Sequence, residues 1–235
     1  MQIMKYPYDL FCLVAGRTQK EFLTGLFTQM YNKSEIHLEL DRVKFKVLEY
    51  RDPGVFRNGI EKFRNDYSTQ AHKMLVFLDY GGSGMERNGK SKSKSKNKGK
   101  ALSTPEGRAQ MMKEVHQFGL YGHVEVFMVE PELEQWVWEG FETIHKCLLM
   151  PKSYEECKSW LENQAEFVAG NNKPLHSPKV LLERMLYELE LPLTSASYKK
   201  LVLALPYLQC SDPVFIQLVA CLINWFPFHP QTSNA

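Results

Sequence analysis

Carboxylate side chains follow two of the strands that the sequence predicts, at the points where those strands end. Asp79 closes one apolar run, and another is followed by three glutamates, Glu130, Glu132 and Glu134. Carboxylate oxygens are ligands that Mg²⁺ prefers, together with water and substrate phosphate. We therefore predict Asp79, Glu130 and Glu132 as catalytic residues, and the same three with Glu134 as ligands of a Mg²⁺ ion.

The same acids also have a structural interpretation. Asp79 is suited to capping a turn, and acids at 130–134 are favourable at a helix N-terminus, where the helix dipole attracts negative charge. The sequence leaves both interpretations open.

The first 140 residues alternate predicted strands and helices. Apolar runs predict strands at 9–14, 44–50, 74–79 and 123–129. Helical spacing predicts a helix from Thr18 to about Tyr31 with Thr18 and Glu21 as a capping box, and another after a turn at 51–54. Two further helices are predicted to begin at Thr104, as N-cap, and at Pro131, as first helical residue.

Strands that alternate with helices favour an α/β fold, a small and mostly parallel sheet with helices on both faces. Ligands of such sheets bind outside the carboxyl ends of the strands, which is where the candidate acids lie. After about Gly140 the pattern becomes helical, with predicted helices at 180–189, 197–205 and 212–225. We predict an α/β domain over 1–140, with a basic insertion at about 87–103, and a helical C-terminal region over 141–235.

The composition narrows the class of protein. The cysteines are odd in number and none forms a C-x-x-C pair, which argues against a disulfide framework or a structural zinc site. No apolar run is long enough to cross a bilayer, and the start of the chain lacks the pattern of a secretory signal. We therefore expect a cytoplasmic protein with reduced thiols and no membrane partner.

Positive charge is concentrated in one segment, which we call the basic tract. Its cations are Arg87, Lys90, Lys92, Lys94, Lys96, Lys98 and Lys100. Without these seven cations, the net charge of +2 becomes −5, so the rest of the chain is mildly acidic. A cationic arm beside the predicted site could bind the phosphates of a nucleic acid without sequence preference. The alternative is a solvated loop insertion with no role.

Three short pieces each end a predicted strand: Leu13-Val14-Ala15-Gly16, Phe77-Leu78-Asp79-Tyr80-Gly81 and Val129-Glu130-Pro131-Glu132-Leu133-Glu134. The pieces and their order resemble Toprim-type folds. They resemble most closely a Toprim-like family of bacterial defence islands, found near ATPases and related to the Toprim domains of OLD-type nucleases. The helical tail adds similarity, in Ser197-Tyr198-Lys199 and in the segment 210–215.

The chain departs from this family at two acids. Members carry Glu-Gly after the first strand, Asp-x-Asp after the third and Glu-Pro-Glu after the fourth. Gly16, Asp79 and the 130–132 run match, but Ala15 and Gly81 stand where acids would be. Toprim-type enzymes cut or join nucleic-acid backbones with Mg²⁺ and a glutamate acid/base. The resemblance therefore implies a degenerate centre, in which a metal on Asp79 and a nearby glutamate would be held weakly.

The resemblance implies a component of a bacterial anti-phage defence system. We expect a Toprim-like subunit that binds nucleic acid, a partner ATPase or another defence-system subunit, with little catalysis of its own. The alternative is an active Mg²⁺-dependent nuclease acting on DNA or RNA.

A third hypothesis comes from a string that satisfies the Walker pattern. Residues Gly84 to Ser91 fit G-x-x-x-x-G-K-[ST], in which Lys90 would bind phosphates and Ser91 a Mg²⁺ ion. A P-loop continues directly into a helix, but the residues that follow Ser91 provide no apolar face for one. Nucleotide binding is therefore the second alternative.

Overall fold

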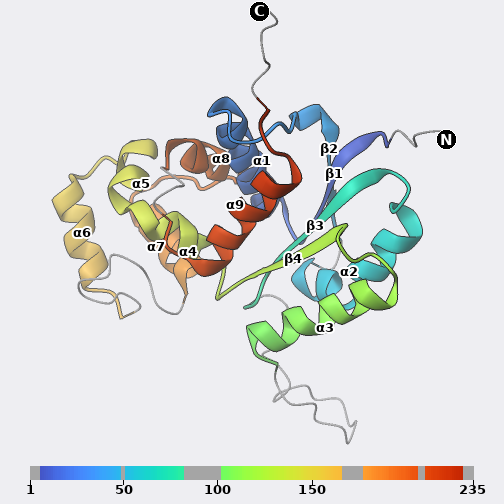
Figure 1. The fold of residues 1–235 in the computed structure, drawn as a ribbon. Coiled ribbons are helices and arrows are strands. Elements are labelled where there is room, and N and C mark those ends of the chain that lie inside the picture. The colour runs from blue at the N-terminus through green and yellow to red at the C-terminus, as the bar shows by residue number, and fades with distance from the viewer. Residues whose placement is uncertain (1–5, 49–50, 82–101, 166–176, 206–209, 230–235) are drawn as a thin grey trace, which may run out of the picture.

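The computed structural model describes residues 6–48, 51–81, 102–165, 177–205 and 210–229. Its centre is a four-stranded sheet, in which every strand runs parallel to its neighbours. The spatial order is β2 (Val43–Val47), β1 (Tyr8–Val14), β3 (Ala71–Asp79) and β4 (Val124–Val129), as Figure 1 shows. The predicted α/β class, a small parallel sheet with helices followed by a helical C-terminal part, is confirmed.

Two helices cover one face of the sheet. They are α2 (Arg51–Asp66) and α3 (Thr104–Gln117). Because side chains alternate along a strand, Phe11, Val76 and Val126 point to this face, where they form one apolar cluster with residues of both helices. Central strands buried on both faces read as continuous apolar runs, which explains why β1 and β3 could be predicted.

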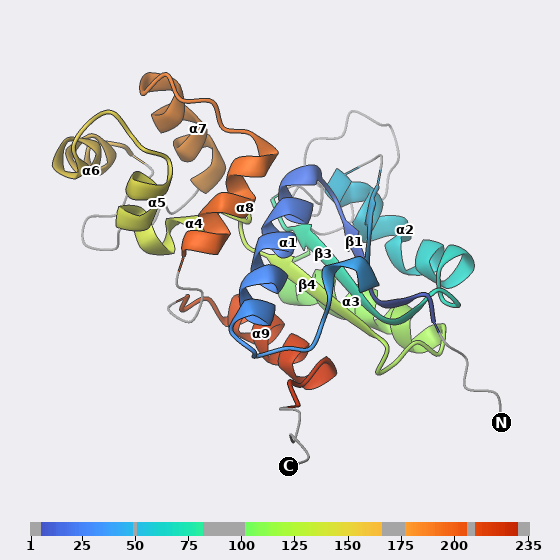
Figure 2. The same cartoon turned by 90° about the horizontal axis from the view of Figure 1, so that it is seen from above.

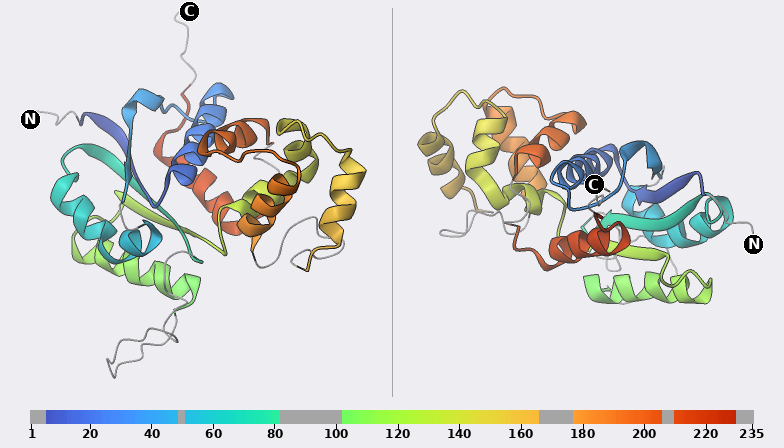
Figure 3. Two further views of the ribbon diagram at one scale, coloured as in Figure 1. Left: turned by 180° about the vertical axis from the view of Figure 1, so that it is seen from behind. Right: turned by 45° about the horizontal axis from the view of Figure 1, so that its top comes forward.

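The other face is covered by α1 (Arg17–Asn32) and α9 (Pro213–Trp225), and α8 (Ser195–Ala204) packs against α1. Figure 2 and Figure 3 show these helices on the opposite side of the sheet from α2 and α3. Helix α1 approaches α8 closely at Gly25, where a Cβ atom would lie 3.0 Å from the carbonyl oxygen of Lys199 and 3.0 Å from Cβ of Val202.

The remaining helices lie beside the sheet, beyond the carboxyl end of β4. They are α4 (Glu134–Val137), the 3₁₀ turn η3 (Trp138–Gly140), α5 (Phe141–Cys147), α6 (Tyr154–Glu162) and α7 (Pro178–Glu188). Trp136 and Trp138 are both buried. The Trp136 ring contacts the rings of Phe22, Phe77 and Phe215, from α1, β3 and α9. Nε1 of Trp138 donates to the carbonyl oxygen of Pro178 at 2.9 Å. The division at residue 140 stays a prediction, and a single apolar cluster runs across it.

The C-terminal end of α9 returns to an early part of the chain. Ile36 forms an antiparallel bridge with Pro227, and the backbone N–H of His37 donates to the carbonyl oxygen of Phe226 at 2.9 Å. The bridge follows α1 and precedes the 3₁₀ turn η1 (Leu40–Arg42) that leads into β2. Within the described residues, no helix is both long and apolar enough to cross a bilayer.

Four predicted helix starts need correction. Helix α2 begins at Arg51, where a turn was expected, because Pro53 falls in the first turn and removes only an N–H that has no helical partner. Helix α1 begins at Arg17, after the extended residue Gly16, so Thr18 lies inside the helix and caps nothing.

The other two starts are displaced along the chain. Ser103, not Thr104, is the N-cap of α3, and it forms a capping box with Glu106 through two hydrogen bonds of 2.7 and 2.8 Å. The helix expected from Pro131 begins only at Glu134. This later start of α4 decides that Glu134, and not Glu130, lies in the protein interior.

Candidate functional site: a buried carboxyl cluster

The carboxyl ends of β1 and β3 form the point where the chain reverses its direction across the sheet. From β1 the chain moves outward to β2, and from β3 it moves outward to β4. In open α/β sheets this switch point is where ligands bind. Asp79, the last residue of β3, lies at this point, as the strand ends predicted.

Gln19, from the first turns of α1, fills the space at the switch point. Its Oε1 accepts the backbone N–H of Ala15 at 2.7 Å, which fixes the orientation of the side-chain amide. Its Nε2 then donates to Oδ2 of Asp79 at 2.9 Å and to Oδ1 of Asp52 at 3.2 Å. Gln19 is only 4% exposed, so one neutral amide joins two carboxyl groups in a nearly closed environment.

Both oxygens of Asp79 are occupied by donors. Besides the bond from Gln19, Oδ1 accepts the backbone N–H of Leu133 at 2.9 Å. The backbone N–H of Asp79 donates to Oδ1 of Asp52 at 2.7 Å, so the two acids are linked directly as well. Burial raises the pKa of Asp79 well above its ordinary value, and the nearby charges of Asp52 and Glu134 raise it further.

Asp52 and Glu134 complete the cluster. Burial raises the pKa of Asp52, against the hydrogen bonds from Asp79 and Gln19, which lower it. Glu134 is 2% exposed and accepts the hydroxyl of Tyr198 at 2.6 Å. Burial also raises the pKa of Glu134, and the Tyr198 bond acts in the opposite direction.

We call Gln19, Asp52, Asp79, Glu134 and Tyr198 the carboxyl cluster. Its members come from α1, α2, β3, α4 and α8, so the cluster links the sheet to the C-terminal helices. The acids meet hydrogen-bond donors of the protein itself, which is the arrangement that makes buried carboxyl groups tolerable. The three acids of the cluster therefore share raised pKa values, which favour their protonated forms compared with exposed carboxyl groups.

The structure divides the four predicted acids. Asp79 and Glu134 belong to the carboxyl cluster, whereas Glu130 is exposed and accepts the hydroxyl of Thr104 at the start of α3. Glu132 is partly exposed, and its charge raises the pKa of Glu134. Among the residues that the structure describes, no group of three or more His, Cys, Asp and Glu side chains is placed to hold a metal ion. The metal and catalytic assignments stay predictions.

The two departures from the Toprim-like pattern have defined places. Ala15 is buried, and its backbone N–H is the group that orients Gln19. Gly81 follows β3, and its backbone N–H donates to the carbonyl oxygen of Pro131 at 2.9 Å. Neither position brings an acid to the switch point, so Asp52 is the acid that accompanies Asp79 there.

Sequence reasoning missed Gln19 and Asp52 as site residues, and it noted Tyr198 only within a short similarity. Asp52 carried a signal, since it is an acid beside a proline at a helix start, but it was assigned to a turn. Gln19 carried no signal, because an amide inside a helix is common and its partner Asp79 is 60 residues away.

The basic tract and the Walker-like string Gly84–Ser91 lie outside the described residues, so both stay predictions. Their attachment points are described. The hydroxyl of Tyr80 donates to the carbonyl oxygen of Leu102 at 2.9 Å, and the backbone N–H of Tyr80 donates to the carbonyl oxygen of Val129 at 2.8 Å. The segment 82–101 therefore leaves and re-enters the described fold at the carboxyl edge of the sheet, next to the carboxyl cluster.

No protein-family model, no curated protein and no solved structure matches this chain.

Proposed function

We propose that this chain is a Toprim-like binding subunit of a bacterial anti-phage defence system, with a catalytically degenerate centre. In this role it binds nucleic acid through the basic tract, a partner ATPase, or both. The defence role rests on the resemblance of the strand-end pieces and the tail. The degenerate centre rests on the chain's own residues.

The bridging amide of Gln19 carries the proposal of a degenerate centre. Two carboxylates at a strand-end crevice hold a cation only if their oxygens are available to it. Here one oxygen of Asp52 and both oxygens of Asp79 accept hydrogen bonds from protein donors. A metal would have to displace the amide and the Leu133 N–H, which leaves buried donors without partners.

Charge distribution supports nucleic-acid binding. The seven cations of the basic tract contrast with a mildly acidic remainder of the chain. The hydrogen bond between Tyr80 and Leu102 holds the two attachment points of this segment together at the carboxyl edge. Phosphate contacts made there would give affinity that falls steeply with salt.

The test is DNA binding, measured by fluorescence anisotropy between about 50 and 200 mM salt. Two triple Lys→Gln variants with the same change of charge are compared with the wild type. The tract variant replaces Lys92, Lys94 and Lys96, and the control replaces three exposed lysines elsewhere, Lys44, Lys152 and Lys200.

We expect the tract variant to lower the slope of log K against log salt by about 2 to 3 for duplex DNA, roughly 0.9 per phosphate contact. The control should keep the wild-type slope. Equal slopes for both variants would remove the basic tract from the proposal.

The degenerate centre is tested separately, by incubating plasmid and single-stranded DNA with the wild type in Mg²⁺ or Mn²⁺. We expect no cleavage above a preparation of Asp79→Asn. Nicking that depends on the metal and is lost in Asp79→Asn would establish the nuclease alternative instead.

A further inference from the structure

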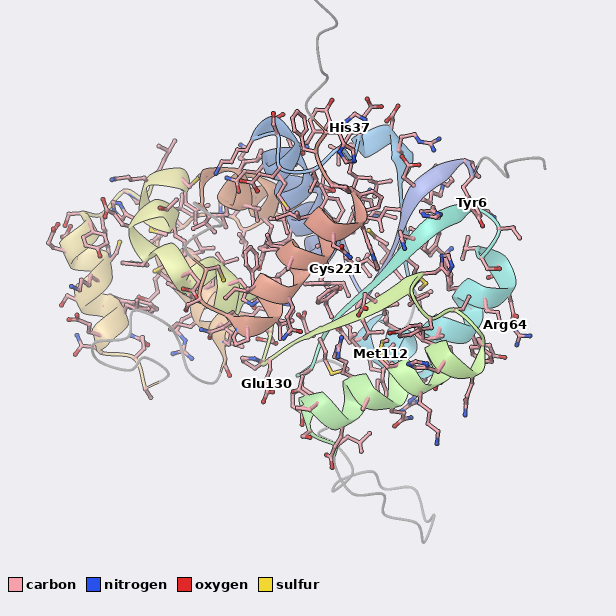
Figure 4. All side chains as sticks on the ribbon, viewed as in Figure 1. Tyr6, His37, Arg64, Met112, Glu130 and Cys221 are labelled. Carbon is pink, nitrogen blue, oxygen red and sulfur yellow. The ribbon has the colours of Figure 1, made fainter. Side chains whose placement is uncertain are left out.

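Strand β4 is an edge strand of the described sheet, and a groove runs along its open side. The groove lies between α3 and α9 and has a volume of about 770 Å³. Figure 4 shows Met112 on α3 and Cys221 on α9, on either side of β4. Val126, Phe127 and Met128 of β4 form its floor.

The backbone of β4 presents hydrogen-bonding groups to this groove. The carbonyl oxygens of His123 and Val129 face β3, where they accept the N–H groups of Met74 at 2.7 Å and Tyr80 at 2.8 Å. Because backbone groups alternate along a strand, Val126 and Met128 direct theirs outward. In the described sheet, β4 pairs with β3 alone, so the N–H of Val126 and both backbone groups of Met128 face no further strand.

The two walls of the groove differ in charge. The α3 wall carries Arg108, Lys113 and His116, and no acidic residue lines the groove. The α9 wall contributes Val214 and Gln217, and the whole sequence of α9 contains no charged residue. A strand lying in the groove would therefore meet the cations Arg108 and Lys113 on one side and a neutral wall on the other.

We propose that an extended segment of a partner protein, with alternating acidic and apolar side chains, adds as a fifth strand to β4. Successive side chains of a strand point to opposite faces, so acidic residues would face Lys113 and His116 while apolar residues face Val214. The open backbone groups of Val126 and Met128 supply the main-chain hydrogen bonds, which give such strand additions their affinity.

Arg108 makes the addition selective for an acidic strand. Its Nε donates to the carbonyl oxygen of Val126 at 2.9 Å and its Nη2 donates to Glu125 at 3.2 Å, so the guanidinium covers part of the edge. The side chain is 42% exposed and can move aside. When a strand takes over the Val126 carbonyl, a carboxylate of that strand offers the guanidinium a charge-assisted hydrogen bond in return.

The experiment uses fluorescein-labelled peptides of about seven residues, the length of a typical strand. The first peptide alternates Glu and Val, and the second alternates Lys and Val. The third contains the same residues as the first, with all Glu in one block and all Val in another. We expect the wild-type protein to bind the first at least about tenfold more tightly than either of the others. Equal binding of the three peptides, or no binding of the first, overturns the proposal.

A matched pair of variants locates the site. Lys113→Glu with His116→Glu reverses the charge of the α3 wall, and Lys200→Glu with His37→Glu makes the same change at exposed positions elsewhere. We expect the first variant to bind the alternating Glu/Val peptide at least about tenfold more weakly than the wild type does. The affinity of the second variant should stay within about twofold of the wild-type value. Equal effects of the two variants would mean attraction to overall charge and not to the groove.

N-methylated peptides test the strand addition without altering the protein. Methylation of alternate amides removes donors either on the side that faces β4 or on the opposite side. The peptide methylated on the side that faces β4 should no longer bind, and the peptide methylated on the opposite side should still bind. The reason is that only one side of an added strand forms hydrogen bonds with the edge strand. Equal loss with both sets overturns a strand-like pose.

Two other occupants appear as separate results. Displacement of the peptide by single-stranded DNA would assign the groove to phosphate, and a dimer that the peptide dissociates would assign it to a second copy of the chain. Either result overturns the proposal. The proposal assigns no residue of the basic tract to this site, so the Lys92, Lys94 and Lys96 variant should bind the peptide normally even if nucleic-acid binding fails.

Discussion

Nε2 of Gln19 lies 2.9 Å from Oδ2 of Asp79 and also reaches Asp52, so one amide group stands between two carboxyl groups. Two carboxylates this close repel each other unless a donor or a cation lies between them. In this chain the donor is part of the fold. The consequences for metal binding, pH dependence and stability can each be measured.

Replacing the amide with a third carboxylate should create a metal site. In Gln19→Glu, three acids face one another, and we expect Mn²⁺ or Mg²⁺ to raise the unfolding temperature of the variant but not of the wild type. A metal at about 100 times its Kd would contribute about 2.7 kcal/mol. The measurement is differential scanning fluorimetry with and without metal. The control is Gln110→Glu on exposed α3, and a metal response there as large as in Gln19→Glu would contradict the prediction.

Asp79 should make the protein less stable as the pH rises. Because its pKa is raised in the folded state, the folded protein binds more protons than the unfolded chain between the ordinary value of 3.8 and the raised one. The stability that Asp79 contributes is therefore fully present at low pH and is lost as the pH rises through the raised pKa. The side-chain amide introduced by Asp79→Asn does not titrate. The free energy of unfolding of this variant, relative to that of the wild type, should therefore rise by up to about 1.4 kcal/mol per pH unit.

Urea unfolding of Asp79→Asn and the wild type across this pH range gives the comparison directly. Asp41→Asn, at an exposed position of η1, serves as the control and should follow the wild type. Parallel curves for Asp79→Asn and the wild type would show that Asp79 binds no extra proton in the folded state.

Loss of the Tyr198 hydroxyl should destabilise the fold through Glu134. Tyr198→Phe removes the donor 2.6 Å from a carboxyl group that is 2% exposed, and a bond of this type contributes about 2 kcal/mol. The loss should grow as the pH rises through the raised pKa of Glu134, because the charged form of Glu134 gains most from the donor. Tyr187→Phe, at a side chain 83% exposed, should have no effect on the urea midpoint at any of these pH values.

Gly25 should tolerate no side chain, although it lies within a helix. Alanine there would gain about 1 kcal/mol of helix propensity, but its Cβ would lie 3.0 Å from the Lys199 carbonyl oxygen across the α1–α8 contact. We expect a net loss of roughly 1 to 3 kcal/mol for Gly25→Ala and a larger one for Gly25→Val, measured by urea unfolding. Gly16→Ala is the control, since a Cβ there meets nothing within 4 Å. A more stable Gly25→Ala would mean that the two helices separate easily.

The sheet could be predicted because the burial of β1 and β3 on both faces leaves long apolar runs in the sequence. Asp79 could be predicted as a site residue for the same reason, since it ends such a run. Gln19 and Asp52 could not, because their roles depend on how α1 and α2 approach the end of β3. Glu134 is buried and Glu130 is exposed because α4 begins at Glu134. The sequence predicted the start of this helix at Pro131 instead, so it could not separate the two glutamates.

The bridge between Ile36 and Pro227 joins two segments of which the ribosome makes the second long after the first. Until α9 emerges, the sheet face that carries Leu10, Cys12 and Phe77 lacks part of its cover. Contacts so distant in sequence close late, and an uncovered apolar face is prone to aggregation in the meantime. While this protein is being synthesised, this apolar face of the sheet therefore stays only partly covered until α9 has been made.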